Sequence, residues 1–317
     1  MVAAQVQAAP SVRTSRASAS SAAIAVGTAS VAWVGALTLQ RSHALGAGLV
    51  AGWGELLAPA LVALVIGVMV CEQLWPAERR PLLARGHVQD ACFLLVYAST
   101  VVPLMLLMGV GFASLLVQHV NGIEAPWTAT WPRWLLISVT LVAMDACNWL
   151  AHWADHRFRA LWRFHAVHHS QEEMSVLTSF RAHPFVHTIG FLLATVPVVA
   201  LTGDRPMAPV LITLYLCLGT LTHANVPWDF GPFGRVLVSP AYHRLHHSID
   251  CPEGANLGVV LNVWDVLTRR AVFPRRGAPA CSTGLSGRPL SNEQTNPRRR
   301  PLPLLVTQLT EPFSSPS

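Results

Sequence analysis

This sequence contains no lysine, so all 22 of its cationic side chains are arginines, and only 12% of its residues are charged. Soluble domains usually carry about 25% charged residues. The deficit argues against a soluble cytosolic enzyme and against a disordered protein. A nucleic-acid-binding protein would gather its positive charge in stripes on a polar domain, whereas these arginines lie in short loops between apolar runs. We therefore expect an integral membrane protein without a nucleic-acid partner.

Several common site signatures are also missing. The six cysteines are scattered, several of them inside apolar runs, and none forms a CxxC pair, which argues against a disulfide framework and a cysteine zinc site. The match of residues 46–51 to the dinucleotide fingerprint GxGxxA follows no strand and carries little weight. No other segment resembles a convincing nicotinamide, flavin or haem site.

Apolar runs divide the first half of the chain. A helix needs about 20 apolar residues to cross the hydrocarbon core of a bilayer. Residues 1–21 are rich in Ala, Ser and Arg, which indicates a disordered tail or a transit peptide. We expect the segment 22–134 to form N-terminal transmembrane helices, although the first run is a weak candidate for a span. The runs cover residues 22–39, 56–71, 91–117 and, at the start of the next domain, 134–151.

Two shorter runs, 188–201 and 207–222, flank a turn composition at residues 202–206. We interpret the pair as a membrane hairpin near 188–222, inside a domain that covers residues 135–273. Residues 274–317 are rich in Pro, Arg and Ser and are expected to form a disordered tail.

The distribution of arginines predicts an orientation. Arginines lie between the second and third runs and again after the fourth, whereas residues 118–132 contain none. By the positive-inside rule, everything after residue 151 faces the cytoplasm. The predicted location is a bacterial inner membrane with the site on its cytoplasmic face.

Histidines carry the chemical signal. Eleven of the 14 histidines lie between residues 152 and 247, and eight of these form one HxxxH and two HxxHH motifs. Residues three and four apart share one face of a helix, so each motif can present several imidazoles to metal. Roughly 0.03 HxxHH matches are expected by chance at this composition, and two occur. The motif residues are His152, His156, His165, His168, His169, His243, His246 and His247, and His223 stands at the end of the hairpin.

Nine histidines exceed the ligand number of a single ion. Four or five nitrogens on each of two metals would leave room for a small exogenous ligand, and paired ions are a recognised catalytic arrangement. Imidazole suits Fe, Zn, Cu and Ni. The sequence therefore predicts an all-α integral membrane protein, a helical transmembrane bundle with a cytoplasmic, histidine-rich di-metal helical cap.

The motif segments WLAHWADHR, LWRFHAVHHS and YHRLHHS carry a family resemblance. In this order they resemble the fatty acid hydroxylase/sterol desaturase superfamily, in particular its bacterial sterol-desaturase-like branch. The resemblance covers roughly residues 135–270. It implies a membrane-embedded oxygenase with two iron ions held by the nine histidines, and with His183 as a less certain tenth ligand. It also implies that Asp155, Asn225 and Asn256 orient ligands or hold a water molecule, while His187 is structural.

By the same resemblance, the expected reaction uses O2 and external electrons to hydroxylate or desaturate a lipid, such as a sterol, a fatty acyl chain or a related isoprenoid. A separate donor, a ferredoxin or a cytochrome with its reductase, would supply the electrons. Arg157, Arg159, Arg163 and the pair Arg275 and Arg276 could dock it, or could simply be positive-inside charge. Three alternatives stay open: a zinc-dependent membrane hydrolase, a metal transporter or store, and an inactive metal-binding member of the superfamily. The hydrolase would need a general base, and no HExxH motif occurs.

Overall fold

The computed structural model describes residues 58–81, 84–203, 208–275, 280–285 and 301–314. Every element in these ranges is helical, and the only β-type contacts in them are isolated bridges. The predicted all-α fold is confirmed. The tail 1–21, the apolar run 22–39, the GxGxxA match at 46–51 and Arg276 lie outside the described residues.

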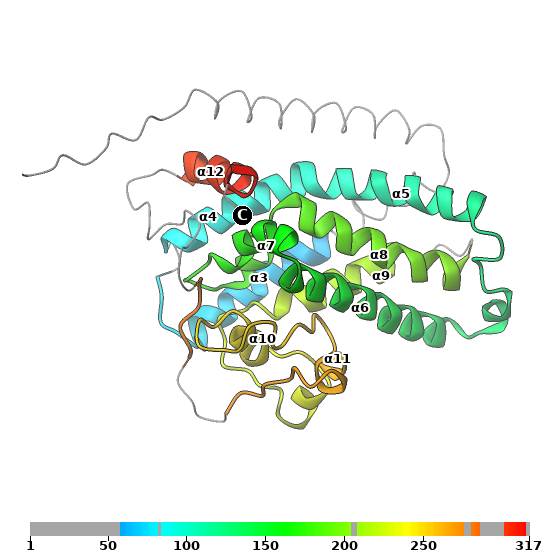
Figure 1. Ribbon diagram of the computed structural model, residues 1–317. Coiled ribbons are helices and arrows are strands. Elements are labelled where there is room, and N and C mark those ends of the chain that lie inside the picture. Colours follow the sequence, from blue (N-terminus) through cyan, green and yellow to red (C-terminus); the bar gives the residue numbers. More distant parts are fainter. Residues whose placement is uncertain (1–57, 82–83, 204–207, 276–279, 286–300, 315–317) are drawn as a thin grey trace, which may run out of the picture.

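Three long apolar helices form the body of the molecule. The first is a continuous rod made of α4 (Arg85–Val96), the π-helical turn η2 (Tyr97–Val101) and α5 (Val102–His119). The others are α6 (Arg133–Arg157) and α8 (Pro184–Thr202), and each of the three is long and apolar enough to cross a membrane. Figure 1 shows α8 lying between α5 and α6. These helices follow the predicted runs 91–117, 134–151 and 188–201, and they make the chain an integral membrane protein.

Two shorter apolar helices complete this body. They are α3 (Ala58–Leu74) and α9 (Ala208–Leu221). The predicted hairpin near 188–222 corresponds to α8 and α9, but α9 packs mainly against α3, with further contacts to η4 (Val176–Phe180) and α6. Leu136 and Met144 of α6 share one core cluster with Ala194 of α8 and Leu211 of α9. Thus α6 contacts both helices of the pair, and how deep the pair sits in a membrane stays a prediction.

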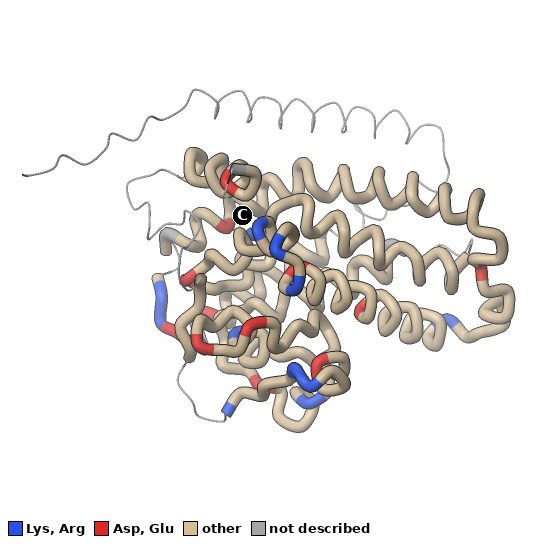
Figure 2. The backbone as a smooth tube through the Cα atoms, in the orientation of Figure 1, with Lys and Arg blue, Asp and Glu red and all other residues tan. Residues whose placement is uncertain are grey.

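Short elements gather at one end of the long helices (Figure 1). Figure 2 shows that charged residues concentrate at this same end, whereas the shafts of α5, α6 and α8 carry few. A histidine-rich, polar end therefore adjoins an apolar helical body. The short elements here are α7 (Arg159–His169), η4 (Val176–Phe180), η5 (Gly231–Arg235), α10 (Pro240–His246) and α11 (Val263–Leu267), while η3 (Pro126–Thr130) lies in the connection from α5 to α6.

One charged group inside a long helix faces protein, as its cost in lipid requires. The carboxylate of Asp145 on α6 is 1% exposed and accepts hydrogen bonds from the backbone N–H groups of Val260 and Leu261 and from Trp264 Nε1. These bonds attach the loop that precedes α11 to the middle of α6.

The C-terminal segment differs from the expected loose tail. Residues 301–314 form helix α12 (Pro301–Ser314), which packs against α4 and α7. Leu305 of α12 is buried in a cluster with Phe93 and Val167. Residues 301–314 form a helix because they pack against α4 and α7. The average composition of residues 274–317, which is rich in Pro and Arg, does not indicate this helix.

Candidate metal centre

The histidine motifs occupy the helix ends that meet at the polar end of the body. His152 and His156 lie in the last turns of α6, which ends at Arg157. Phe158 adopts an extended conformation, and α7 then begins at Arg159, so the chain turns back and presents the second motif to the first. The third motif lies on α10 and its C-cap residue His247, and His223 follows α9.

The nine histidines fall into two groups, each with nitrogens within 4.8 Å of one another. The five-histidine cluster contains His152, His156, His165, His169 and His246, and the four-histidine cluster contains His168, His223, His243 and His247. The clusters adjoin, since the rings of His169 and His247 stack with centroids 4.4 Å apart. The two adjacent histidines of each HxxHH motif belong to different clusters.

Backbone carbonyl groups fix the orientation of several rings. The Nδ1 atoms of His152, His168 and His246 lie 2.8, 3.0 and 2.8 Å from the carbonyl oxygens of Leu257, Arg181 and Ala255, respectively. A carbonyl oxygen only accepts hydrogen bonds, so each Nδ1 carries the proton of a neutral ring. The Nε2 atoms of these three rings are therefore bare acceptors, as metal coordination requires.

The spacing of the bare nitrogens fits a shared cation. The Nε2 atoms of His168 and His223 lie 3.0 Å apart. The Nδ1 atom of His223 lies 3.3 Å from the carbonyl oxygen of Gly219, so it too carries its ring's proton. With both protons on Nδ1, no hydrogen bond can join these two lone pairs, and they repel each other. A metal about 2.1 Å from each nitrogen would hold two ligands at right angles about 3.0 Å apart. Similar contacts of 3.0 to 3.1 Å join His223 to His243 and His165 to both His152 and His169.

Unpartnered buried nitrogens support the same conclusion. Among the described residues, five cluster members have ring nitrogens that are buried and without a hydrogen-bond partner. Leaving such groups unpaired costs about 1–3 kcal/mol each, and a cation removes that cost. The five are His156, His165, His243, His246 and His247.

Burial also keeps these imidazoles neutral. Desolvation lowers the pKa of His168 to about 3, and it lowers the pKa of His165, His169, His223 and His243 well below the ordinary value. A neutral imidazole is the form that binds a metal. A donor set made only of imidazole suits Fe, Zn, Cu or Ni and disfavours Mg and Ca.

Of the residues expected to orient ligands, Asp155 lies next to a cluster ring and Asn256 does not contact one through its hydrogen bonds. Asp155 Oδ2 lies 3.8 Å from His165 Nδ1, and its other oxygen is buried without a partner among the described residues. Asn256 adopts a positive φ of 58°, and its side chain forms hydrogen bonds with the backbone of Tyr242 and Val272 rather than with a cluster ring. Its flanking residues, Ala255 and Leu257, supply the carbonyls to His246 and His152.

Two other sequence candidates lie away from the rings. Asn225 forms hydrogen bonds with the backbone of Glu78 and accepts one from Arg244 of α10, so it joins the segment around Glu78 to α10 next to His243. His183 belongs to neither cluster. It caps α8 by accepting a hydrogen bond from Phe185 N, and its ring contacts Phe164 and Phe313. The structure therefore does not bring His183 to the candidate metal centre.

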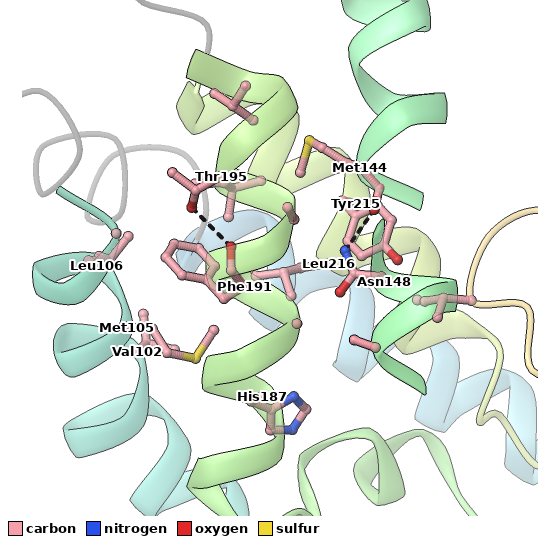
Figure 3. A pocket seen from close by; sticks show the side chains of 18 of the residues that line it. Val102, Met105, Leu106, Met144, Asn148, His187, Phe191, Thr195, Tyr215 and Leu216 are labelled. Atoms are coloured by element: carbon pink, nitrogen blue, oxygen red, sulfur yellow. Dashed lines mark hydrogen bonds between the residues drawn. The ribbon is translucent and has the colours of Figure 1, made fainter. Parts of the chain in front are cut away.

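A cavity of about 760 Å³ leads from the histidines along α8. Its lining is mostly apolar and comes from α5, α6, α8 and α9, with His152, His168, His223 and His243 at the polar end. Figure 3 shows Leu106, Phe191 and Leu216 along the apolar part and His187 nearer one end. At the far end the lining includes Gln118, Glu124 and Gly203.

Sequence reasoning missed two kinds of residue here. It assigned His187 a structural role, yet this side chain lines the cavity. It also gave no role to Asp265, whose carboxylate accepts hydrogen bonds from the N–H groups of Leu257 and Gly258. The isolation of His187 in an apolar helix, away from the three motifs, is the one signal that could have identified it.

Comparison with known proteins identifies a family for the segment that holds the clusters. Residues 137–269 match the fatty acid hydroxylase family. The chain is 30% identical over 190 residues to ornithine lipid hydroxylase OlsE of Rhizobium tropici, a match that covers 59% of this chain and 53% of that protein.

More distant relatives are alkylglycerol monooxygenases. The enzyme of Danio rerio is 27% identical over 145 residues, which cover 45% of this chain and 31% of that protein. The human enzyme is 24% identical over 143 residues, which cover 44% and 30%, respectively. This chain thus spans about half the length of the ornithine lipid hydroxylase and about a third of the monooxygenases. No solved structure matches the chain.

Proposed function

We propose that the protein is a membrane-bound lipid hydroxylase or desaturase with two iron ions, a proposal supported by the match of residues 137–269 to the fatty acid hydroxylase family. The observation that carries the proposal is the pair of adjacent, buried, nitrogen-only clusters at one end of a largely apolar cavity. The named relatives are hydroxylases and monooxygenases, which are oxidoreductases.

The nine clustered histidines would hold the two ions. When bound, iron supplies the redox chemistry with O2 that replaces or removes hydrogen at an unactivated C–H bond, a chemistry that Zn²⁺ lacks. The protein contributes the rest. Backbone carbonyls at residues 181, 255 and 257 keep His168, His246 and His152 in the tautomer that binds metal. The buried surroundings exclude bulk water from the reacting carbon.

The substrate of this proposal is a lipid. The relatives are named for an ornithine lipid and for alkylglycerols, both amphiphiles with a long apolar chain. A cavity of about 760 Å³ lies within the range of about 300–1,000 Å³ typical of ligand pockets. Long apolar helices such as α5 and α8 line it, so a hydrocarbon chain would reach the metal centre directly from the membrane.

Electrons would come from a separate donor protein, a ferredoxin or a cytochrome with its reductase. Trp162 offers an entry point because its ring is half-buried, with its centroid 5.0 Å from that of His156 and 5.3 Å from that of His169. Arg157 and Arg159 are exposed beside it. An acidic surface on the donor would complement these charges.

The proposed location is a bacterial inner membrane, with the metal centre facing the cytoplasm. Support comes from the arginines. Arg79, Arg157 and Arg159 are exposed at the end that carries the histidines, while residues 118–132 at the other end contain no arginine and Arg133 follows them at the start of α6. The positive-inside rule places the arginine-rich end in the cytoplasm.

Metal analysis tests the proposal most directly. We expect protein purified in detergent from cells grown with labelled iron to contain close to two irons per chain, and Mössbauer spectroscopy to show that they are coupled. The variant His168→Ala should lose iron, because it removes one ligand and unpairs the Arg181 carbonyl. His119→Ala is the matched control, since His119 is exposed and outside both clusters.

Two outcomes would contradict the proposal. Zinc without iron, even after anaerobic reconstitution with ferrous iron, would eliminate the oxygenase and favour a zinc-dependent hydrolase. Bound iron with no O2 consumption in the presence of a reductant and a lipid extract would favour an inactive member of the superfamily.

A further inference from the structure

Most polar side chains that line the cavity are satisfied by the protein itself. The hydroxyl group of Thr195 donates to the carbonyl oxygen of Phe191 at 2.9 Å, and that of Ser179 to the carbonyl oxygen of Thr220 at 3.0 Å. The Tyr215 hydroxyl group donates to Asp145 at 3.3 Å. These groups present little unmet hydrogen-bonding capacity to a ligand, so they behave as part of the apolar wall.

Outside the two clusters, two described lining residues have a buried polar atom without a partner: Asp155, which lies against His165 of the metal centre, and His187, which lies on α8. The Nε2 atom of His187 is buried and has no hydrogen-bond partner among the described residues. Its ring packs edge-on against Tyr97, with centroids 5.3 Å apart, and lines the cavity from α8 (Figure 3). An unpaired polar atom in an apolar site is costly. A ligand that hydrogen-bonds His187 would remove that cost.

Asn148 places a second polar atom nearby. Its side-chain N–H group donates to the carbonyl oxygen of Met144, and its Oδ1 faces Gly190, where an added Cβ would lie only 2.9 Å away. Gly190 follows His187 by three residues, so the two share one face of α8. We call His187 and Asn148 the polar collar.

The polar collar lies between the metal centre and the apolar part of the cavity. Asn148 precedes His152 by one helical turn on α6, so the collar adjoins the five-histidine cluster. In the other direction, α8 continues along the cavity from His187 to Gly203, which is about 24 Å at 1.5 Å per residue. The lining of this stretch includes Phe191, Ala194 and Val198.

We infer that the polar collar binds a neutral oxygen or amide group of the lipid, so that the reacting carbon lies close to the headgroup and the apolar tail points away from the metal. This inference rests on the proposed function and names the part of the substrate that reacts. In the reverse orientation, with the headgroup near Gln118 and Glu124, methylene groups would lie against His187 and leave its Nε2 unpaired.

The lining also limits the chemistry of the bound group. No arginine is among the described residues that line the cavity, so a phosphate or other anion at the polar collar would lack a counter-charge. Ether, ester and amide groups and hydroxyl groups fit, because neutral imidazole and a primary amide can hydrogen-bond each of them. The π-helical turn η2 includes Tyr97, beside His187, and such turns are frequent at functional sites.

A pair of matched probes tests the inference. Hexadecyl methyl ether and octadecane have the same number of heavy atoms, and one oxygen distinguishes them. Binding of each is measured by equilibrium dialysis of iron-loaded protein in nanodiscs, against empty nanodiscs that correct for partitioning. One hydrogen bond should make the wild-type protein bind the ether about fivefold more tightly than the alkane.

Three variants separate the hydrogen bond from cavity shape. His187→Phe should lose the preference for the ether, whereas His187→Gln, which can still form a hydrogen bond, should keep part of it. Thr195→Val removes a polar atom whose bond is made within α8, so it should change binding of both probes alike and retain the preference. Iron content reports whether each variant is folded at the metal centre.

An ether preference that is equal in the wild-type protein and in His187→Phe would overturn the inference, and so would the absence of any preference in the wild-type protein. Repeating the dialysis on chelated protein keeps the two hypotheses apart. A protein that binds no iron contradicts the proposed function, yet its ether preference still reports on the polar collar.

Discussion

Asp265 holds the backbone next to the candidate metal centre through hydrogen bonds. Its carboxylate is fully buried and accepts a hydrogen bond from the backbone N–H group of Leu257. The carbonyl oxygen of Leu257 lies 2.8 Å from His152 Nδ1, so fixing this backbone also fixes the His152 ring. Each carboxylate oxygen accepts two hydrogen bonds, one from the backbone and one from a side chain. The donors are Leu257 N and Trp149 Nε1 for Oδ1, and Gly258 N and Tyr242 OH for Oδ2.

Replacing Asp265 should therefore weaken metal binding. Asn at this position offers one acceptor oxygen and turns an amide NH2 group toward two donors. We expect Asp265→Asn to hold iron about 10- to 100-fold more weakly, the usual effect of losing a group that orients a ligand. Retained iron is measured after dialysis against increasing chelator. Asp250→Asn, at an exposed position, is the control; equal iron retention in the two variants would refute the role of Asp265.

At the scale of single residues, the sequence predicts which histidines come together better than it predicts the groups that orient them. Histidines three and four residues apart on a helix lie on the same face. The nine histidines expected at the metal centre all lie in the two clusters. The orienting groups are carbonyl oxygens of Arg181, Ala255 and Leu257. Every residue has a carbonyl group, so no side-chain pattern marks the three that point at a ring. For His183, family position suggested a ligand, but the start of α8 turns its ring toward Phe164 and Phe313.

Elements are predictable where their pattern is long. The charge-free run 91–117 and the run 134–151 correspond to helices that extend further in the structure, because polar residues at their ends, such as His152 and His156, continue the helical turn. Helix α12 was missed because its 14 residues lie in a segment whose average composition is that of a loose tail. Its stability depends on a tertiary contact that composition does not report.

The packing of α12 can be tested with two leucines from the same helix. Leu305 is 5% exposed and packs with Phe93 and Val167, whereas Leu302 is 66% exposed. Leu305→Ala should lower the free energy of unfolding by about 2–5 kcal/mol, because it leaves a cavity under α12. Leu302→Ala should change it by less than about 0.5 kcal/mol. Thermal unfolding in one detergent compares them, and equal losses would show that α12 does not pack on α4 as described.

At the scale of the whole molecule, the buried histidines couple folding to metal and to pH. Burial lowers the pKa of His168, His223, His243 and His247 in the folded protein, and in the unfolded chain histidine titrates near pH 6.5. Above about pH 6.5 neither state binds protons at these rings, so stability does not depend on them. Below that pH the unfolded state binds more protons than the folded state, and stability falls as pH falls.

Metal should suppress this dependence. We expect the unfolding temperature of chelated protein to drop steeply between about pH 6.5 and 5, with several histidines contributing together. Iron-loaded protein should keep its unfolding temperature further into the acid range, since a bound cation stabilises the folded state until protons displace it. His119→Ala, which alters an exposed histidine outside the clusters, should leave both profiles unchanged. Identical acid profiles with and without iron would mean that the clusters, although buried, do not hold the metal that stabilises the fold.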